Sequence, residues 1–211
     1  MKYRRNLILE LLVLSICWIV LFSCDSKQND IHIFYLHGKI VQEQGLEATS
    51  EKFGKYEYRA IIDSLKGRSK HIYSEIRKPD TEFNEFCVHT SNQIDSLIKI
   101  GVEPKDILII GASMGGVMAM QISTINENPV NYVFLGANNN SIEEELDFDL
   151  HGRILGIYEK SDSICGNDYK YWINKCEKVD EFKEIQINTQ LGHGFLYRPL
   201  KEWIDPIKEM L

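Results

Sequence analysis

A serine between two glycines is the residue of this chain best placed to do chemistry. Ser113 lies in a Gly-x-Ser-x-Gly sequence that follows the apolar run 106–110 and precedes the helix-like stretch 117–122. A strand, a sharp turn and a helix in that order raise a serine hydroxyl above the edge of a sheet, and small neighbouring residues let strand and helix pack closely. The pattern indicates nucleophilic acyl transfer; the alternative is an ordinary turn between strand and helix.

Two later segments supply the residue types that such a serine requires. A serine hydroxyl is too weakly acidic to attack at neutral pH, so it needs a base within hydrogen-bond reach and a group that orients the base. His193 lies between two glycines, after an apolar strand pattern, and Asp162 follows another such pattern. A histidine between two glycines on a loop is a poor core residue. Asp168 is close to Asp162 in the sequence and is an alternative for the acid.

The rest of the chain alternates strand patterns with helix patterns. Apolar residues three and four positions apart predict amphipathic helices over 53–65 and 83–100. Apolar runs predict strands over 31–36, 71–76, 106–110, 131–135, 153–158 and 184–188. Strands that alternate with helices pair in parallel through right-handed crossovers. The sequence therefore predicts an α/β fold, doubly wound, with a mainly parallel six-stranded sheet flanked by helices.

The order of these features resembles the α/β-hydrolase family, in which a serine on a strand-to-helix turn, an acid and a histidine follow one another along the chain. The resemblance covers residues 31–211 and implies that Ser113, Asp162 and His193 form a catalytic triad. In that triad His193 would accept the serine proton, and Asp162 would fix the histidine tautomer. The implied function is a serine hydrolase of the esterase or lipase type, which cleaves a carboxylic ester or related acyl bond through an acyl-serine intermediate.

The same resemblance implies an oxyanion hole and no cofactor. The negative oxygen of the tetrahedral intermediate would be bound by the backbone N–H of Met114, after the nucleophile, and that of Lys39, after His37 and Gly38. Neither a metal nor an organic cofactor is implied. Two other functions are compatible with these residues: a non-catalytic binding protein of the cell envelope, and an acyltransferase that uses the same serine.

Two departures from the family pattern suggest an open site. The chain starts its first strand pattern without the two extra antiparallel strands of full-size members, so the fold is expected to be trimmed at the N-terminus. Residues 136–152 are too few for a helical cap domain. We therefore expect a lidless site that is covered at most by the loop 39–52. Loops above the carboxyl ends of parallel strands form the binding crevice, so this loop is the leading candidate for a substrate contact.

The first residues have the layout of a secretory signal, with basic residues at 2, 4 and 5 before the apolar stretch 7–22. Ser23 and then Cys24 follow this stretch, and the sequence from Leu21 to Cys24 resembles the lipobox of bacterial lipoproteins. The resemblance implies a lipoprotein signal peptide over 1–23, lipidation of Cys24, a tether over 24–30 and the hydrolase domain over 31–211. The protein would then be lipid-anchored in the bacterial cell envelope after export. An uncleaved membrane anchor and a plain cleaved signal are the alternatives.

Composition limits the partners. Acidic residues outnumber basic ones by 31 to 24, and the formal net charge is −7, which argues against nucleic acid as a partner. The expected partners are a small ester or acylated substrate and, through the lipid anchor, the membrane. Cys165 and Cys176 could form a disulfide in an oxidising compartment. No cysteine or histidine grouping has zinc spacing, and the acidic run 143–145 is interpreted as a solvated face rather than a calcium loop.

Overall fold

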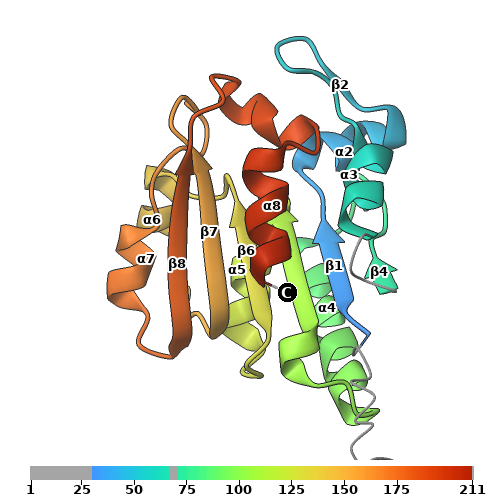
Figure 1. Cartoon of the computed structure of the whole chain (residues 1–211), viewed down its shortest axis with the longest axis vertical. Helices are drawn as coiled ribbons and strands as arrows, with labels where there is room; N and C mark the ends of the chain where they lie inside the picture. Colours follow the sequence, from blue (N-terminus) through green and yellow to red (C-terminus); the bar gives the residue numbers. More distant parts are fainter. Residues whose placement is uncertain (1–29, 67–70, 211) are drawn as a thin grey trace, which may run out of the picture.

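A wholly parallel six-stranded sheet forms the centre of the computed structural model, which describes residues 30–66 and 71–210 (Figure 1). The strand order is β4-β1-β5-β6-β7-β8, with every neighbouring pair parallel. The bounds are β1 His32–Leu36, β4 His71–Tyr73, β5 Ile107–Ala112, β6 Asn131–Leu135, β7 Gly152–Glu159 and β8 Val179–Ile187. This sheet confirms the predicted fold class. The predicted signal peptide 1–23 and the predicted lipidation site Cys24 lie outside the described residues.

Helices cover both faces of the sheet, which is why its central strands are apolar on both sides. In Figure 1, α8 (Lys201–Met210) and α3 (Tyr58–Leu65) lie over one face, and α4 (Phe83–Lys99) and α5 (Met114–Ile125) lie over the other. Consecutive residues of β5 alternate between two cores: Ile110 packs in the core that contains Trp203 of α8, and Ile109 packs in the core that contains Met118 of α5. The layers are those of a doubly wound fold.

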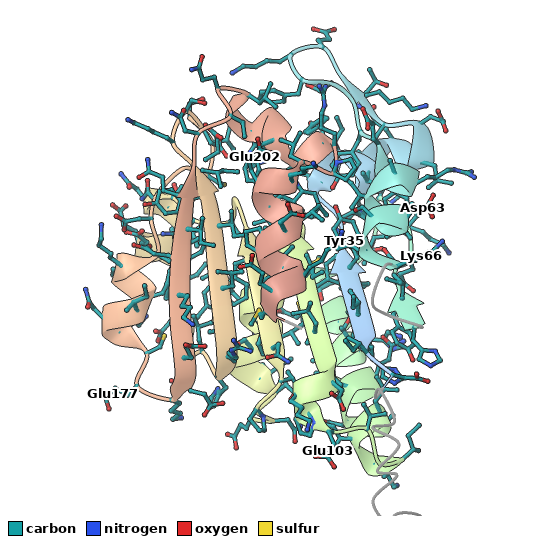
Figure 2. The ribbon with its side chains drawn as sticks, viewed as in Figure 1. Tyr35, Asp63, Lys66, Glu103, Glu177 and Glu202 are labelled. Carbon is teal, nitrogen blue, oxygen red and sulfur yellow. The ribbon has the colours of Figure 1, made fainter. Side chains whose placement is uncertain are left out.

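Shorter elements complete the chain around these layers. Within the described residues they include α2 Lys39–Gln44, α6 Asn140–Glu145 and α7 Lys170–Lys175, and the 3₁₀ helices Gly45–Glu47, Pro104–Asp106 and Gly192–Tyr197. The segment between β6 and β7 contains the six-residue helix α6 and its flanking turns. Figure 2 shows the labelled side chains Asp63, Lys66, Glu103 and Glu177 at the periphery of the ribbon, Glu202 on α8, and Tyr35 on β1 in the interior, where it is 1% exposed.

The register of the strands places their carboxyl ends together. Leu36, the last residue of β1, pairs with Gly111 of β5, and Ala112 of β5 pairs with Leu135 of β6. The segments that follow these strands therefore leave the sheet at one edge, the upper edge in Figure 1. Ser113 begins one of these segments.

Three predicted boundaries differ from the observed ones by three residues or more. The expected helix 53–65 begins only at Tyr58, because the residues before it form an antiparallel hairpin of β2 (Thr49–Ser50) and β3 (Gly54–Lys55). The Ser50 hydroxyl accepts hydrogen bonds from the N–H groups of Lys52 and Phe53, which turns the chain at the tip of the hairpin. The expected loop 39–52 therefore has structure of its own, since it also contains α2.

The other two differing boundaries belong to the edge strands β4 and β8. β4 ends at Tyr73 rather than residue 76, and β8 begins at Val179 rather than 184. The first residues of β8 are mostly exposed or half-buried, since the strand lies at the edge of the sheet, so they lack the apolar run by which we identified strands.

The open questions about cysteines and acidic residues have structural answers. Cys165 and Cys176 are free thiols, as is Cys87, so the possible disulfide is not formed. Beyond the acidic run, Asp147 and Asp149 form ion pairs of 2.6 Å with Lys175 and Lys178.

No helix within residues 30–66 and 71–210 combines the length and the apolar character needed to cross a bilayer.

The close approach of β7 to the loop before α7 gives a stability prediction. A Cβ atom added at Gly156 would lie 2.4 Å from the ring of Tyr169, which is fully buried. Gly156→Ala should therefore lower the free energy of unfolding by about 1–3 kcal/mol through overpacking, measured by urea denaturation. Asp63→Ala, on the exposed face of α3, is the control and should change it by less than about 0.5 kcal/mol. An unchanged midpoint for Gly156→Ala would contradict this packing.

Candidate active site

Ser113 occupies a strained turn between β5 and α5. Its backbone has φ 52° and ψ −121°, a left-handed conformation that is costly for a residue with a side chain. The turn is held by hydrogen bonds: the Ser113 N–H donates to the carbonyl of Leu135 (2.9 Å), and the Ser113 carbonyl accepts from Gly116 (2.7 Å). A Cβ added at Gly111 would lie 2.2 Å from the carbonyl oxygen of Gly115. Glycine at position 111 is thus required for the close packing of strand and helix.

The structure brings Ser113, His193 and Asp162 together from three separate segments. His193 Nε2 lies 2.9 Å from the Ser113 hydroxyl oxygen, and His193 Nδ1 lies 2.6 Å from Asp162 Oδ2. Ser113 follows β5, Asp162 follows β7, and His193 lies in the 3₁₀ helix after β8. His193 is 8% exposed and Asp162 is 7% exposed, so their hydrogen bond is shielded from water.

Hydrogen bonds keep Asp162 ionised although it is buried. Burial alone would raise the pKa of Asp162, but the bond to His193 and the backbone N–H groups of Ile164 (2.8 Å) and Cys165 (3.2 Å) hold it below its usual value. The carboxylate then accepts a hydrogen bond from the N–H at His193 Nδ1, which leaves Nε2 as the acceptor that faces Ser113. Asp168, the alternative acid, instead forms an ion pair with Lys170 at 2.6 Å.

The two predicted oxyanion donors both begin helices. Met114 is the first residue of α5, and Lys39 is the first residue of α2. The first N–H groups of a helix have no acceptor within that helix, so they are available to an external oxygen. Gly38 brings the start of α2 close to the serine, because a Cβ added at Gly38 would lie 3.5 Å from the Ser113 Cβ.

A buried arginine that the sequence analysis missed holds the segment before Lys39. Arg77 is 1% exposed; its guanidinium donates to the carbonyl of His37 and, at 3.0 Å, to the side chain of Gln42 in α2. The backbone N–H of Arg77 donates to His37 Nε2 (3.0 Å), so His37 Nδ1 carries the proton and donates to the carbonyl of Gly38 (2.9 Å). The signal that could have found Arg77 is its position directly after the strand pattern 71–76, at the edge where the other segments converge.

This network keeps His37 neutral. Burial, together with the positive charge of Arg77, lowers the pKa of His37 to about 4. Burial likewise lowers the pKa of Arg77 to about 10, a value at which the guanidinium is charged at neutral pH. The Arg77 guanidinium also stacks 5.2 Å from the ring centre of Phe86.

A cavity of about 690 Å³ opens beside Ser113 and His193. Its walls come from α2, the β2–β3 hairpin and the 3₁₀ helix that carries His193. Apolar side chains line much of it: Ile40, Phe53, Tyr56, Ile164, Leu196 and Tyr197. Charged residues at its rim are of both signs: Lys39, Lys52, Glu43 and Glu51. The segment 39–52 supplies much of this lining, which is where a contact with substrate was expected.

The hairpin contacts the histidine segment directly. The ring of Phe53, at the tip of the hairpin, lies 6.4 Å from the ring of His193 and 5.5 Å from that of Tyr197, measured between centroids. The hairpin is also anchored at its end, where the Glu57 N–H donates to the carbonyl of Tyr197 (2.7 Å). Figure 1 shows the hairpin above the upper edge of the sheet, beside the start of α2. It therefore forms one side of the cavity.

Comparisons with known proteins identify the fold. No protein-family model matches the chain, and no curated protein matches it in sequence. Among solved structures, it is similar to Arabidopsis thaliana SOBER1 (13% identity, 86% of this chain and 97% of that one, TM-score 0.54). It is also similar to a lipase-esterase related protein from Clostridium acetobutylicum (14%, 88% and 96%, 0.54) and to an esterase from Pyrococcus furiosus (14%, 87% and 82%, 0.54). The chain has the fold of the α/β-hydrolases.

The buried His37 side chain makes the free energy of unfolding depend on pH. Because His37 binds a proton at about pH 4 when folded but near its ordinary pKa of 6.5 when unfolded, the unfolded state binds more protons between these values. The free energy of unfolding should therefore fall as the pH is lowered from about 6.5 to 4. His37→Asn should make this slope shallower in urea denaturation at several pH values. The control His89→Asn, at an exposed position of α4, should leave it unchanged; equal slopes for both variants would refute the assignment.

Proposed function

We propose that the protein is a serine hydrolase that cleaves a carboxylic ester, or a related acyl bond, through an acyl-Ser113 intermediate. The observation that carries this proposal is the hydrogen-bonded series Ser113–His193–Asp162, with distances of 2.9 and 2.6 Å. The strained backbone of Ser113 supports it, since strain of this kind persists where the surrounding structure enforces it and is common at active sites.

In the proposed first step, the Ser113 oxygen attacks the carbonyl carbon while His193 Nε2 takes the serine proton. The carbonyl bond opens, and its oxygen becomes negatively charged. The N–H groups of Met114 and Lys39 are the proposed donors to that oxygen. Asp162 stabilises the positive imidazolium, and its two backbone donors hold the carboxylate in place.

The intermediate then collapses. The bond to the leaving alcohol breaks as His193 returns its proton to the alcohol oxygen, and an acyl-Ser113 ester remains. In the second half, His193 takes a proton from water, the hydroxide attacks the acyl carbon, and Ser113 regains its proton as the acid product leaves. These steps use only groups of this chain together with substrate and water, so we propose no metal or organic cofactor.

The lining of the cavity suggests what part of a substrate enters it. Its apolar walls favour burial of an uncharged acyl or alkoxy group, whereas the rim charges remain in contact with solvent. We also propose export as a lipid-anchored protein of the bacterial envelope. The support for this is the sequence pattern around Cys24 alone.

An activated serine can be tested with a fluorophosphonate probe on the purified protein. Ser113 should be labelled, and Ser113→Ala should remove the labelling because the attacking oxygen is gone. Ester turnover should fall by about three orders of magnitude or more in Ser113→Ala and in His193→Ala, and the double variant should lose little further, because the two residues act as a unit. Ser96→Ala, at an exposed position of α4, is the matched control and should behave as the native protein does.

The same experiment separates the alternatives. A folded native protein that the probe does not label would refute the serine hydrolase and favour a binding protein on this fold. Labelling accompanied by transfer of the acyl group to added alcohols or amines, in preference to water, would identify an acyltransferase. Product analysis by mass spectrometry distinguishes these outcomes.

The cavity gives a prediction about chain length. Ile40→Trp should fill space beside Ser113, so the ratio of kcat/KM for an octanoate ester to that for an acetate ester should fall about 10-fold or more. The rates are measured with p-nitrophenyl esters. Ile125→Trp, at a partly exposed position at the end of α5, is the control and should keep the native ratio. An unchanged ratio in Ile40→Trp would mean that the acyl chain binds elsewhere.

A further inference from the structure

A second carboxylate, outside the proposed triad, is buried between the loops that carry Asp162 and His193. Glu159 is the last residue of β7 and is 0% exposed. Among the ion pairs formed within residues 30–66 and 71–210, none includes Glu159. Burial of a carboxylate is costly unless hydrogen bonds replace its hydration, so the donors around Glu159 determine what it does.

Four neutral donors surround this carboxylate, two on each oxygen. Oε1 accepts from the backbone N–H (3.2 Å) and the hydroxyl (2.9 Å) of Ser161. Oε2 accepts from the backbone N–H (2.7 Å) and the hydroxyl (2.8 Å) of Thr189. Burial alone would raise the pKa of Glu159, but these bonds lower it overall, so the group is ionised at neutral pH. Only an ionised carboxylate can accept all four bonds at once.

The two hydroxyls extend these bonds to the residues beside the proposed triad. The Ser161 hydroxyl accepts from the N–H of Gly192 (3.1 Å), and the Thr189 hydroxyl accepts from the N–H of Leu191 (3.3 Å). Leu191 and Gly192 directly precede His193, and Ser161 directly precedes Asp162. One carboxylate thus links the chain on both sides of the His193–Asp162 hydrogen bond.

The backbone before His193 needs such support. β8 ends at Ile187 and the 3₁₀ helix begins at Gly192, so the segment between them lies outside regular secondary structure. Gln190 in this segment has a left-handed backbone with φ 61°, and so does Gly192, the first residue of the 3₁₀ helix, with φ 55°. The hydrogen bonds that lead to Glu159 are therefore the contacts best placed to fix the position of the His193 backbone.

We propose that Glu159 is a positioning residue that holds His193 at the distance from Asp162 and Ser113 that the reaction requires. The proposal rests on the proposed function, because it concerns the same site. Glu159 itself touches none of the three residues with its carboxylate. It acts through Ser161 and Thr189, and it binds the two loops to each other at the end of β7.

The test replaces the carboxylate by the amide of the same shape. In Glu159→Gln one oxygen becomes an NH₂ group that faces a backbone N–H, and two donors cannot bond to each other. The rate of fluorophosphonate labelling and kcat for an ester should fall about 10- to 100-fold, with KM changed little, because the reacting groups are displaced rather than removed. The matched control is Glu184→Gln on β8, whose carboxylate accepts from the backbone N–H of Tyr169 (2.8 Å), at the far end of the loop that carries Asp162; it should label at the native rate.

A second measurement reports on geometry without activity. The proton in the 2.6 Å bond between His193 and Asp162 should give a low-field proton NMR signal in the native protein, identified by its absence in His193→Gln. This signal should be lost or broadened in Glu159→Gln and kept in Glu184→Gln. If the native protein shows the signal but is not labelled by the probe, the hydrolase function fails while the signal still tests the role of Glu159.

Two milder variants keep the proposal testable if Glu159→Gln does not fold. Ser161→Ala and Thr189→Val each remove one hydroxyl and leave a backbone bond to Glu159 in place. Each should slow labelling, and the two combined should slow it by less than the product of the single effects, because both hydroxyls act through one carboxylate. Native labelling rates and an unchanged NMR signal in Glu159→Gln, or in both milder variants, would overturn the proposal.

Discussion

Because all six strands run parallel, every segment that follows a strand starts from the same edge of the sheet. Ser113 follows β5, Asp162 follows β7, His193 follows β8, and the segment of His37 follows β1. Residues separated by as many as 80 positions therefore come within hydrogen-bond distance. The pairing register, which is set by apolar residues buried on both faces, determines which side chains meet.

Two buried ionic groups then refine what the sheet brings together. Arg77 and Glu159 are each almost wholly shielded from solvent, and each is compensated by neutral backbone and side-chain partners. Such burial is costly, and removing one partner leaves a charge uncompensated. In the strand order of the sheet, Arg77 follows β4 on one side of β5 and Glu159 ends β7 on the other, so the two groups flank the strand that precedes Ser113. Arg77 holds the start of α2, and Glu159 holds the loops after β7 and β8. The hydrophobic core supplies stability, whereas these two groups fix local geometry.

Much of the fold could be predicted from local sequence. The strand 131–135 was predicted with its observed bounds, because a short apolar run between polar segments leaves few alternatives. The meeting of Ser113, Asp162 and His193 was implied by the resemblance to the α/β-hydrolases, in which the serine, the acid and the histidine each follow a strand. The hairpin 49–55, the start of β8 and the roles of Arg77 and Glu159 were not, since edge strands lack a continuous apolar run and hydrogen bonds between distant loops leave no periodic pattern.

The three free cysteines of the described chain bear on how the protein responds to its surroundings. Burial raises the pKa of the Cys87 thiol to about 12 and that of the Cys165 thiol to about 11, and it also raises the pKa of Cys176. The reactive form of cysteine is the thiolate, which is scarce at neutral pH in all three. The described fold is therefore held together without a disulfide, and its three thiols offer little to electrophiles or peroxides.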